Sequence, residues 1–476
     1  MARTVPLWHF PPITATAWVL IALDQGTSEL AVIVLAAGMG TRMKSDLPKV
    51  MHPLAGRPMI QHLMETVSGL APDKVVVVVG PGMDVVAQAV APAQTVVQTE
   101  RLGTGHAVMQ ARDLLKDFHG DVLVLYGDTP LITKDTLQRM LAERRNADKN
   151  PAVVVLGFKP VDPGHYGRLV VGAEGLKAIV EFKDANDDQR EIPLCNSGVM
   201  AFDGACLWDR LARIGNDNAK GEYYLTDVVG LARGDGANCS FVLGDEQELL
   251  GVNSRAELAG AEAIIQGELR RAAMDDGATL VDPASVWFSW DTSLGRDVMV
   301  WPHVVFGPGV TIGDHVVIKG FCHFEGCTIA DGADVGPYAR LRPGAEIGAA
   351  AHIGNFVEVK KSVIEAGAKV NHLSYIGDAQ VGADANVGAG TITCNYDGFT
   401  KSCTEIGAGA FIGSNSSLVA PVKVGARAMI GAGSVITKDV SDGALAVGRG
   451  AQMEVAGWAD RFRAAKAAEK AKKQGK

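Results

Sequence analysis

Two stretches of the sequence combine residue types that could do chemistry, and the first lies near the N-terminus. In LAAGMGTRMKSDLPKVM (35–51), Gly38 and Gly40 follow an apolar run and leave backbone N–H groups free to approach phosphates. Arg42 and Lys49 add two positive charges to the same loop. Glycines alone would be typical of an ordinary strand-to-helix turn, and the pattern is neither a Walker A nor a G-x-G-x-x-G motif. The added charges favour a polyphosphate ligand.

The second stretch is NHLSYIGD (371–378), which interrupts a repeat of small and aliphatic residues. Val370 and Ile376 keep the spacing of that repeat and should point inward, so His372 falls at a turn and should face outward. A lone histidine at a turn is most often simply solvated. Tyr375 is a second exception in the same few positions. The stretch is therefore either part of a plain scaffold or part of a site.

Other exceptions accompany this histidine along the repeat. Arg342 lies in RLRPG and Lys360 lies in VEVKK. A nineteen-residue step from Val387 to Ile406 replaces the usual short step. A regular solenoid has no structural need for such an excursion, and long ordered insertions in rigid scaffolds often carry function. These features together favour an enzyme site in the second half.

The first half alternates strand-like and helical patterns. Runs rich in Val and Ile are separated by amphipathic stretches such as 59–70 and 134–146. The strand-like runs are 31–38, 74–80, 95–100, 121–128 and 152–158. This alternation predicts an α/β, Rossmann-like domain with a parallel sheet covered on both faces. Ligands of such sheets bind beyond the carboxyl ends of the strands, where the 35–51 loop and YGD (126–128) would lie.

From about residue 294 the apolar residues recur every six positions, and glycine often follows them. The series is Leu294, Val300, Phe306, Ile312, Ile318, Phe324, Ile329, Val335, Leu341, Ile347, Ile353, Val359, Ile364, Val370, Ile376, Val381, Val387, Ile406, Ile412, Leu418, Val424, Ile430 and Ile436. A six-residue repeat is the signature of a β-helix, in which three hexads make one coil of a narrow prism. The spacing does not reveal the hand of that helix.

The change of period divides the chain into segments. We expect residues 1–30 to be a disordered extension or a misassigned start, 31–254 the α/β domain, 255–276 a linker helix, 277–456 the β-helix, and 457–476 a basic tail. The tail is Ala-rich and charged, so its simplest interpretation is a solvated helix that frays.

Composition excludes several classes of protein. A formal net charge of −9 argues against nucleic acid as the main partner. The seven cysteines form no C-x-x-C pair, which indicates neither a zinc site nor a disulfide framework and favours a reducing compartment. The apolar run ITATAWVLIAL near the N-terminus is shorter than the ~20 residues that span a bilayer. We expect a cytoplasmic protein with neither membrane nor nucleic-acid partners.

The motif L-x-x-G-x-G-T-R-M…L-P-K of the first loop resembles that of the sugar-1-phosphate nucleotidyltransferases. With QTERLGTGHAV (98–108), LYGDTP (125–130) and the hexads, residues 31–456 look like the bifunctional N-acetylglucosamine-1-phosphate uridylyltransferase/glucosamine-1-phosphate N-acetyltransferase family. The resemblance implies a left-handed β-helix and a homotrimer. It also implies that glucosamine-1-phosphate is acetylated from acetyl-CoA. The N-acetylglucosamine-1-phosphate so formed is then joined to UTP, which releases pyrophosphate and UDP-N-acetylglucosamine for cell-wall and lipopolysaccharide synthesis.

In the first half the resemblance implies a nucleotide site with Mg²⁺. Asp128 and Asn253 match its metal ligands, although alone they would be ordinary turn residues. Arg42 and Lys49 match its catalytic cations. The positions that match contacts to the sugar nucleotide are Leu35, Ala36, Ala37, Gly38, Lys49, Gln98, Gly103, Thr104, Tyr126, Gly127, Asp128, Gly167, Glu181, Asn196 and Asn253. Joining two anions requires charge neutralisation and in-line alignment rather than a protein nucleophile, and Mg²⁺ suits few protein oxygens.

In the second half the resemblance implies an acetyl-transfer site. His372 matches the general base that deprotonates the sugar amine, a task that suits an imidazole with an ordinary pKa near ~6.5. Arg342 and Lys360 match contacts to the sugar phosphate, and Tyr375 and Asn386 match further substrate contacts. The positions that match the acetyl-CoA groove are Ala389, Asn395, Tyr396, Ser414, Ala432 and Arg449.

Two alternatives remain open on the sequence alone. The β-helix could only assemble or regulate a monofunctional nucleotidyltransferase, as in ADP-glucose pyrophosphorylase-like enzymes; His372 and its neighbouring cations speak against this. The whole chain could instead be a non-enzymatic hexapeptide scaffold; Arg42, Lys49, Asp128 and Asn253 speak against that.

Overall fold

The computed structural model describes residues 29–474, which form two compact units that divide between Ala261 and Glu262. The division falls within helix α9 (Arg255–Asp275), where a linker helix was expected. The predicted extension lies outside the described residues except for its last two positions. None of the described helices is both long enough and apolar enough to cross a membrane.

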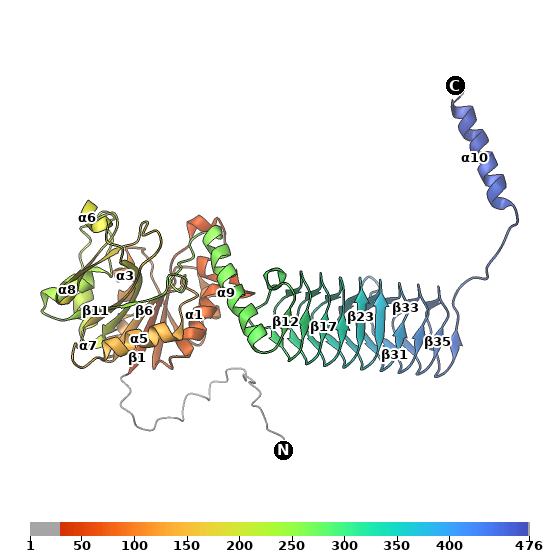
Figure 1. Ribbon diagram of the computed structural model, residues 1–476, viewed down its shortest axis with the longest axis horizontal. Helices are drawn as coiled ribbons and strands as arrows, with labels where there is room; N and C mark the ends of the chain where they lie inside the picture. The colour runs from red at the N-terminus through yellow and green to blue at the C-terminus, as the bar shows by residue number, and fades with distance from the viewer. Residues whose placement is uncertain (1–28, 475–476) are drawn as a thin grey trace, which may run out of the picture. The chain divides into compact units, whose positions relative to one another are not determined.

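A nine-stranded sheet forms the N-terminal unit, in the order β11-β7-β10-β6-β1-β4-β5, with β8 beside β10 and β9 beside β8 (Figure 1). Its strands are β1 (Leu30–Leu35), β4 (Lys74–Val79), β5 (Gln94–Val97), β6 (Asp121–Tyr126), β7 (Val153–Phe158), β8 (Arg168–Gly172), β9 (Gly175–Val180), β10 (Cys195–Asp203) and β11 (Cys239–Leu243). A separate short hairpin joins β2 (Pro53–Leu54) to β3 (Arg57–Pro58).

The strands that the sequence predicted, β1, β4, β5, β6 and β7, all run in one direction, but strands that it did not predict make the whole sheet mixed. β1 is parallel to β4 and β6, but β10 is antiparallel to β6 and β7, and β8 and β9 form an antiparallel pair. β10 is buried along most of its length, and its residues 199–202 form an apolar run like that of a parallel strand. Hydrophobicity alone therefore does not encode its direction.

Helices cover both faces of the sheet, as expected. They are α1 (Met59–Ser68), α2 (Asp84–Ala89), α3 (Thr104–Met109), α4 (Arg112–Leu115), α5 (Lys134–Arg144), α6 (Asp187–Arg190), α7 (Gly204–Leu211) and α8 (Asp227–Gly234), with short 3-10 turns at Thr41–Met43 and Lys49–Met51. Alternate residues of β1 enter different cores: Ile33 packs with α3, α7 and α8, whereas Val32 and Val34 pack with α1, α2 and α5. A strand buried on both faces explains the unbroken apolar run at the start of this domain.

Three parallel sheets form the C-terminal unit and enclose one apolar core (Figure 1). The first face holds β12 (Thr279–Leu280), β14 (Met299–Val300), β17 (Val317–Ile318), β20 (Asp334–Val335), β23 (His352–Asn355), β26 (Lys369–His372), β29 (Asn386–Val387), β32 (Phe411–Ile412), β35 (Met429–Ile430) and β37 (Leu445–Ala446). The second face holds β15 (Val305–Phe306), β18 (His323–Phe324), β21 (Arg340–Leu341), β24 (Glu358–Lys360), β27 (Tyr375–Gly377), β30 (Ile392–Cys394), β33 (Ser417–Val419) and β36 (Val435–Ile436). The third holds β13 (Ser293–Leu294), β16 (Thr311–Ile312), β19 (Cys327–Ile329), β22 (Ala345–Ile347), β25 (Ser362–Ile364), β28 (Ala379–Val381), β31 (Thr404–Ile406) and β34 (Val422–Val424).

The hexad prediction is confirmed, because every residue of the predicted series is buried except Leu294, which is partly buried. The nineteen-residue step is shorter in space than it looks in the sequence. β30 lies inside it, and Thr393 takes the inward position with 1% of its surface exposed. The excursion from the prism therefore covers only residues 395–403, and the Ser402 N–H closes it by donating to the Asn395 carbonyl at 2.9 Å.

Helix α10 (Trp458–Gln474) follows the β-helix, and all of its described side chains are exposed, as the charge pattern of the tail predicted.

Candidate active sites

The loop after β1 starts at the predicted edge of the N-terminal sheet. β1 and β6 are paired in parallel and end side by side at Leu35 and Tyr126. The Gly127 N–H donates to the Leu35 carbonyl at 2.9 Å, which fixes both strand ends. Gly40 has φ +68°, and a Cβ there would lie 2.6 Å from the Cβ of Lys49. Glycine is therefore needed at this position so that the loop can fold against Lys49.

Lys49 joins the two residues that were predicted to bind metal. Its ammonium donates to Asp128 Oδ2 and, at 3.0 Å, to Asn253 Oδ1. Asp128 and Asn253 lie 79 and 204 residues from Lys49 in the sequence. The Val252 N–H donates to the Asp128 carbonyl at 2.8 Å, and the Asn253 N–H donates to Glu257 Oε2 at 2.7 Å. The backbone thus holds the three functional groups together.

The donor set fits a magnesium ion. The Asp128 and Asn253 oxygens already face one cation, the Lys49 ammonium. Within residues 29–474, no group of three or more His, Cys, Asp or Glu side chains could hold a metal by itself. Two protein oxygens leave room for water and substrate oxygens, which Mg²⁺ commonly retains as ligands.

Two arginines, one within this loop and one outside it, have different surroundings. Arg42 is exposed, and the structure gives it no ion pair with any described residue. Arg255, at the start of α9, donates from Nε to the Met43 carbonyl at 3.2 Å and lies 3.3 Å from His52 Nδ1. Burial, and then the charge of Arg255, lower the pKa of His52. No motif singled out Arg255, whose contacts tie the start of α9 to the loop.

Three further predicted residues lie together beyond β5. Gln98 is buried, and its amide donates to the Gly103 carbonyl at 3.2 Å. Gly103 has φ +113°, and a Cβ there would lie 2.6 Å from the Tyr223 carbonyl oxygen. Thr104 Oγ1 accepts from the Leu225 N–H at 3.0 Å. This arrangement presents a buried amide and backbone groups, which can read the edge of a nucleobase.

The predicted sugar contacts form a second group next to Tyr126. A Cβ on Gly198 would lie 2.7 Å from the Tyr126 ring, so glycine lets the ring pack on the backbone; burial raises the pKa of Tyr126. The Asn196 N–H donates to the Gly167 carbonyl at 2.8 Å. A Cβ on Gly167 would lie 3.3 Å from Glu181 Oε1. Gly167, Glu181 and Asn196 are thus neighbours, as the resemblance implied.

Charge and burial around Glu181 point to two residues that the sequence interpretation missed. Burial raises the pKa of Glu181, while Lys220 lowers it and Asp184 raises it further. Tyr224 and Thr226 are buried; the Tyr224 hydroxyl has no hydrogen-bond partner in the described chain, and the Thr226 hydroxyl contacts Glu181 and lowers its pKa. Their signal in the sequence was EYYLTD (222–227), a polar cluster just before α8.

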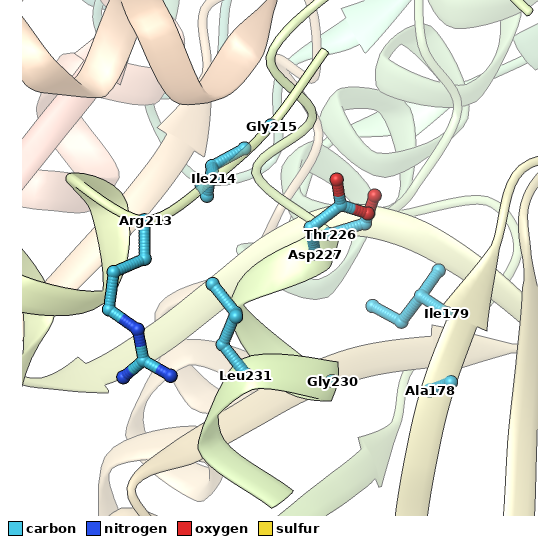
Figure 2. Close-up of a pocket in the computed structure, with 9 residues that line it drawn as sticks. All are labelled: Ala178, Ile179, Arg213, Ile214, Gly215, Thr226, Asp227, Gly230 and Leu231. Atoms are coloured by element: carbon cyan, nitrogen blue, oxygen red, sulfur yellow. The ribbon is translucent and has the colours of Figure 1, made fainter. Parts of the chain in front are cut away.

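Thr226 and Asp227 help to line a cavity of about 310 Å³ (Figure 2). Apolar side chains of Ile179, Ile214 and Leu231 line it. None of the predicted site residues lines this cavity, so we do not assign the predicted nucleotide chemistry to it.

His372 ends β26 and faces solvent, as predicted. Its Nδ1 lies 2.6 Å from Oδ1 of Asn355, the residue opposite it on β23. The His372 carbonyl accepts from Ser374 Oγ at 2.8 Å and from the Gly390 N–H at 3.1 Å. Contacts from the coils on either side therefore fix the corner that carries the imidazole.

The two predicted phosphate contacts and the predicted substrate contact Tyr375 lie on the second face, at three adjacent strands. Arg342 follows β21 and donates to Glu358 Oε1 at 2.8 Å, and Glu358 raises its pKa. Lys360 ends β24, and Tyr375 begins β27. A side-chain hydrogen bond with Lys401, from the 395–403 loop, and then the positive charge of Lys401 lower the pKa of Lys360. Two lysines held this close create a site that favours an anion.

The predicted acetyl-CoA positions follow the corner that begins after His372. Ala389, Ser414 and Ala432 occupy that corner in three successive coils, and Arg449 donates to the Ala432 carbonyl. Asn395 is buried and donates to Asp378, whereas Tyr396 is exposed on the loop and donates to the Gly398 carbonyl.

Asn386 is not beside the phosphate contacts. It begins β29 on the first face, opposite Lys369. The structure therefore places His372 and the corner between the two parts of the predicted acetyl-transfer set.

Comparisons with known proteins bear on both halves. Residues 32–191 match a family model described as a MobA-like NTP transferase domain, and residues 291–326 and 403–438 match one described as bacterial transferase hexapeptide (six repeats). Proteins named bifunctional protein GlmU match almost the whole chain. The one from Paramagnetospirillum magneticum is 74% identical and covers 94% of this chain and 99% of its own. Those from Rhodospirillum rubrum and Azorhizobium caulinodans are 64% and 58% identical, and each covers 92% of this chain and 98% of its own.

The chain belongs to the GlmU family. Membership confirms the resemblance and the fold class, a nucleotidyltransferase domain followed by a left-handed parallel β-helix. It also confirms a bifunctional enzyme of UDP-N-acetylglucosamine synthesis, both an N-acetyltransferase and a uridylyltransferase, with nucleotide and acetyl-CoA substrates. The monofunctional and scaffold alternatives are therefore wrong. The roles of individual residues in these two activities are still predictions.

Proposed function

We propose that the N-terminal unit transfers UMP from UTP to N-acetylglucosamine-1-phosphate at the residues that meet around Lys49. The contact of one ammonium with both Asp128 and Asn253 is the observation that carries this proposal. Asp128 and Asn253 would hold Mg²⁺, which supplies charge neutralisation and alignment when bound. The Lys49 ammonium leaves the Asp128 carboxylate and binds the nucleotide phosphates. The exposed Arg42 binds the pyrophosphate that is released.

Substrate selection follows from the two neighbouring groups of residues. The buried amide of Gln98 binds the uracil edge, and Gly103 and Thr104 let the nucleoside approach the backbone. Glu181 and Asn196 hold the acetamido sugar beside Gly167. The buried Tyr224 hydroxyl, which has no partner among the described residues, lies just before α8 and provides a further hydrogen bond to the sugar.

In the C-terminal unit, His372 acts as the general base for acetyl transfer. Its imidazole takes a proton from the amine of glucosamine-1-phosphate as nitrogen attacks the thioester carbonyl of acetyl-CoA. The new bond is C–N, the bond that breaks is C–S, and the CoA sulfur leaves as thiolate and is then protonated. Arg342 and Lys360, assisted by Lys401, bind the sugar phosphate.

The site is completed in a homotrimer in which a neighbouring copy faces the His372 corner. Asn386 and the phosphate contacts lie on different faces of one prism, so one chain does not enclose a substrate between them. Acetyl-CoA lies along Ala389, Ser414 and Ala432 in the gap between copies. All seven cysteines are free thiols, which suits action in the reducing cytoplasm.

The test is to assay both half-reactions on one purified preparation. His372→Ala should abolish CoA release from acetyl-CoA and glucosamine-1-phosphate, and leave pyrophosphate release from UTP largely intact. Asp128→Asn should do the reverse. Normal acetyl transfer in His372→Ala would refute the base assignment, and normal uridylyl transfer in Asp128→Asn would refute the metal assignment.

A further inference from the structure

An exposed histidine on a rigid prism needs more than its position to act as a base. Neutral imidazole carries its proton on either Nδ1 or Nε2, and only the unprotonated nitrogen can accept another. His372 is exposed, so water could support either form. A fixed contact to one ring nitrogen would remove this ambiguity.

The structure supplies such a contact through Asn355. We propose that Asn355 is a positioning residue for acetyl transfer, whose amide oxygen accepts from Nδ1–H of His372 and leaves Nε2 free to take the amine proton. The two atoms lie 2.6 Å apart. An amide oxygen can only accept, so the hydrogen must be on Nδ1. This inference rests on the proposed role of His372 as the base.

The backbone holds Asn355 and His372 in register. They are paired residues at the ends of the parallel strands β23 and β26, and the Leu373 N–H donates to the Asn355 carbonyl at 3.0 Å. The preceding position allows a close approach, because a Cβ on Gly354 would lie 1.8 Å from the Asn371 carbonyl oxygen. Main-chain pairing therefore places the Asn355 side-chain amide beside the His372 ring.

A neutral acceptor differs from a carboxylate in its effect on the pKa of the imidazole. A carboxylate beside an imidazole favours the protonated ring, which cannot serve as a base. An amide fixes the tautomer without adding that charge. The titratable groups on the paired strands and across the corner are His352, Lys369, Arg342, Glu358 and Lys360.

The experiment compares Asn355→Leu with Asn355→Asp in the full-length enzyme, following CoA release and pyrophosphate release. Asn355→Leu removes the acceptor and should lower kcat for acetyl transfer roughly 10- to 100-fold, with KM values nearly unchanged. Asn355→Asp restores the acceptor and should recover much of kcat. The acidic limb of its kcat/KM profile should move to higher pH by roughly one unit, because the carboxylate favours the protonated ring.

Matched measurements separate positioning from folding. Gln380→Leu removes an amide that donates to Glu365 at 2.8 Å on the third face, and should leave acetyl transfer unchanged. Uridylyl transfer by the same preparations reports that the chain is intact. Wild-type kcat in Asn355→Leu would overturn the proposal, as would equal loss in both Asn355 variants with no change in the pH profile. If His372→Ala itself kept acetyl transfer, the base assignment would fail rather than the role of Asn355.

Discussion

Removing the Lys49 ammonium should make the nucleotide-free enzyme bind divalent metal more tightly. Lys49 now satisfies both oxygens that we assign to the metal, so a metal ion must displace it. Lys49→Met removes the charge and keeps an unbranched stem of similar length against Gly40. The variant should therefore gain metal affinity and lose catalytic power at the same time.

The size of the gain follows from the contacts that are lost. The Lys49 and Asp128 side chains are only 14% and 19% exposed, so water weakens their pairing little. A hydrogen bond between charged groups contributes about 2 kcal/mol, which corresponds to roughly 30-fold in an equilibrium constant. We expect Mn²⁺ to bind the nucleotide-free Lys49→Met enzyme roughly 10- to 30-fold more tightly, whereas pyrophosphate release falls at least roughly 100-fold.

Electron paramagnetic resonance of free Mn²⁺ measures this affinity without any turnover. Arg42→Met is the matched control, because Arg42 is exposed and contacts neither oxygen; its Mn²⁺ affinity should equal that of the wild type. Adding Asp128→Asn to Lys49→Met should cancel the gain. An Mn²⁺ affinity in Lys49→Met no higher than in the wild type would refute the idea that the lysine competes with metal.

Two other substitutions test the predicted sugar site around Glu181 and the packing between coils of the β-helix at Gly354. The raised pKa of Glu181 means that its ionisation destabilises the fold increasingly as the pH rises above the ordinary value of 4.5; Glu181→Gln should raise the melting temperature at pH 7.5 and not at pH 4, while raising KM for N-acetylglucosamine-1-phosphate. Equal melting temperatures at pH 7.5 would contradict this. Gly354→Ala should force β23 and β26 apart, at a cost of roughly 3 kcal/mol, and abolish acetyl transfer but not uridylyl transfer. Gly450→Ala, with open space around it, is the control, and comparable thermal unfolding of the two variants would count against the steric argument.

The sequence predicted those parts of the fold that depend on periodic burial. The hexads identified the inward residues because a narrow prism accepts one apolar side chain at each step. The rule missed Thr393, a polar residue that is tolerated inside because its hydroxyl accepts from the Gly377 N–H at 2.8 Å and donates to the Gly377 carbonyl at 3.1 Å. Because these hydrogen bonds let a threonine take the inward position, the apolar repeat did not predict strand β30.

The N-terminal site was predictable only in part from the residues alone. Strand ends place the 35–51 loop beside Asp128, since neighbouring parallel strands end at one edge. Asn253 lies in irregular backbone before α9, where periodicity carries no information, and only the family resemblance identified it. Tyr224 was missed because its significance comes from burial without a partner, which no sequence pattern reports.

The two sites place their key groups by different physical means, and this difference suits their chemistry. Lys49 begins a short 3-10 turn outside the sheet and must exchange a carboxylate for a phosphate, so its side chain has to move during the reaction. His372 lies at the end of strand β26, and main-chain pairing with β23 sets its position opposite Asn355. A base that must present one particular ring nitrogen is helped by this rigidity. Mutations that loosen the β-helix should therefore impair acetyl transfer before they unfold it, because a small shift between the two strands already breaks the 2.6 Å contact.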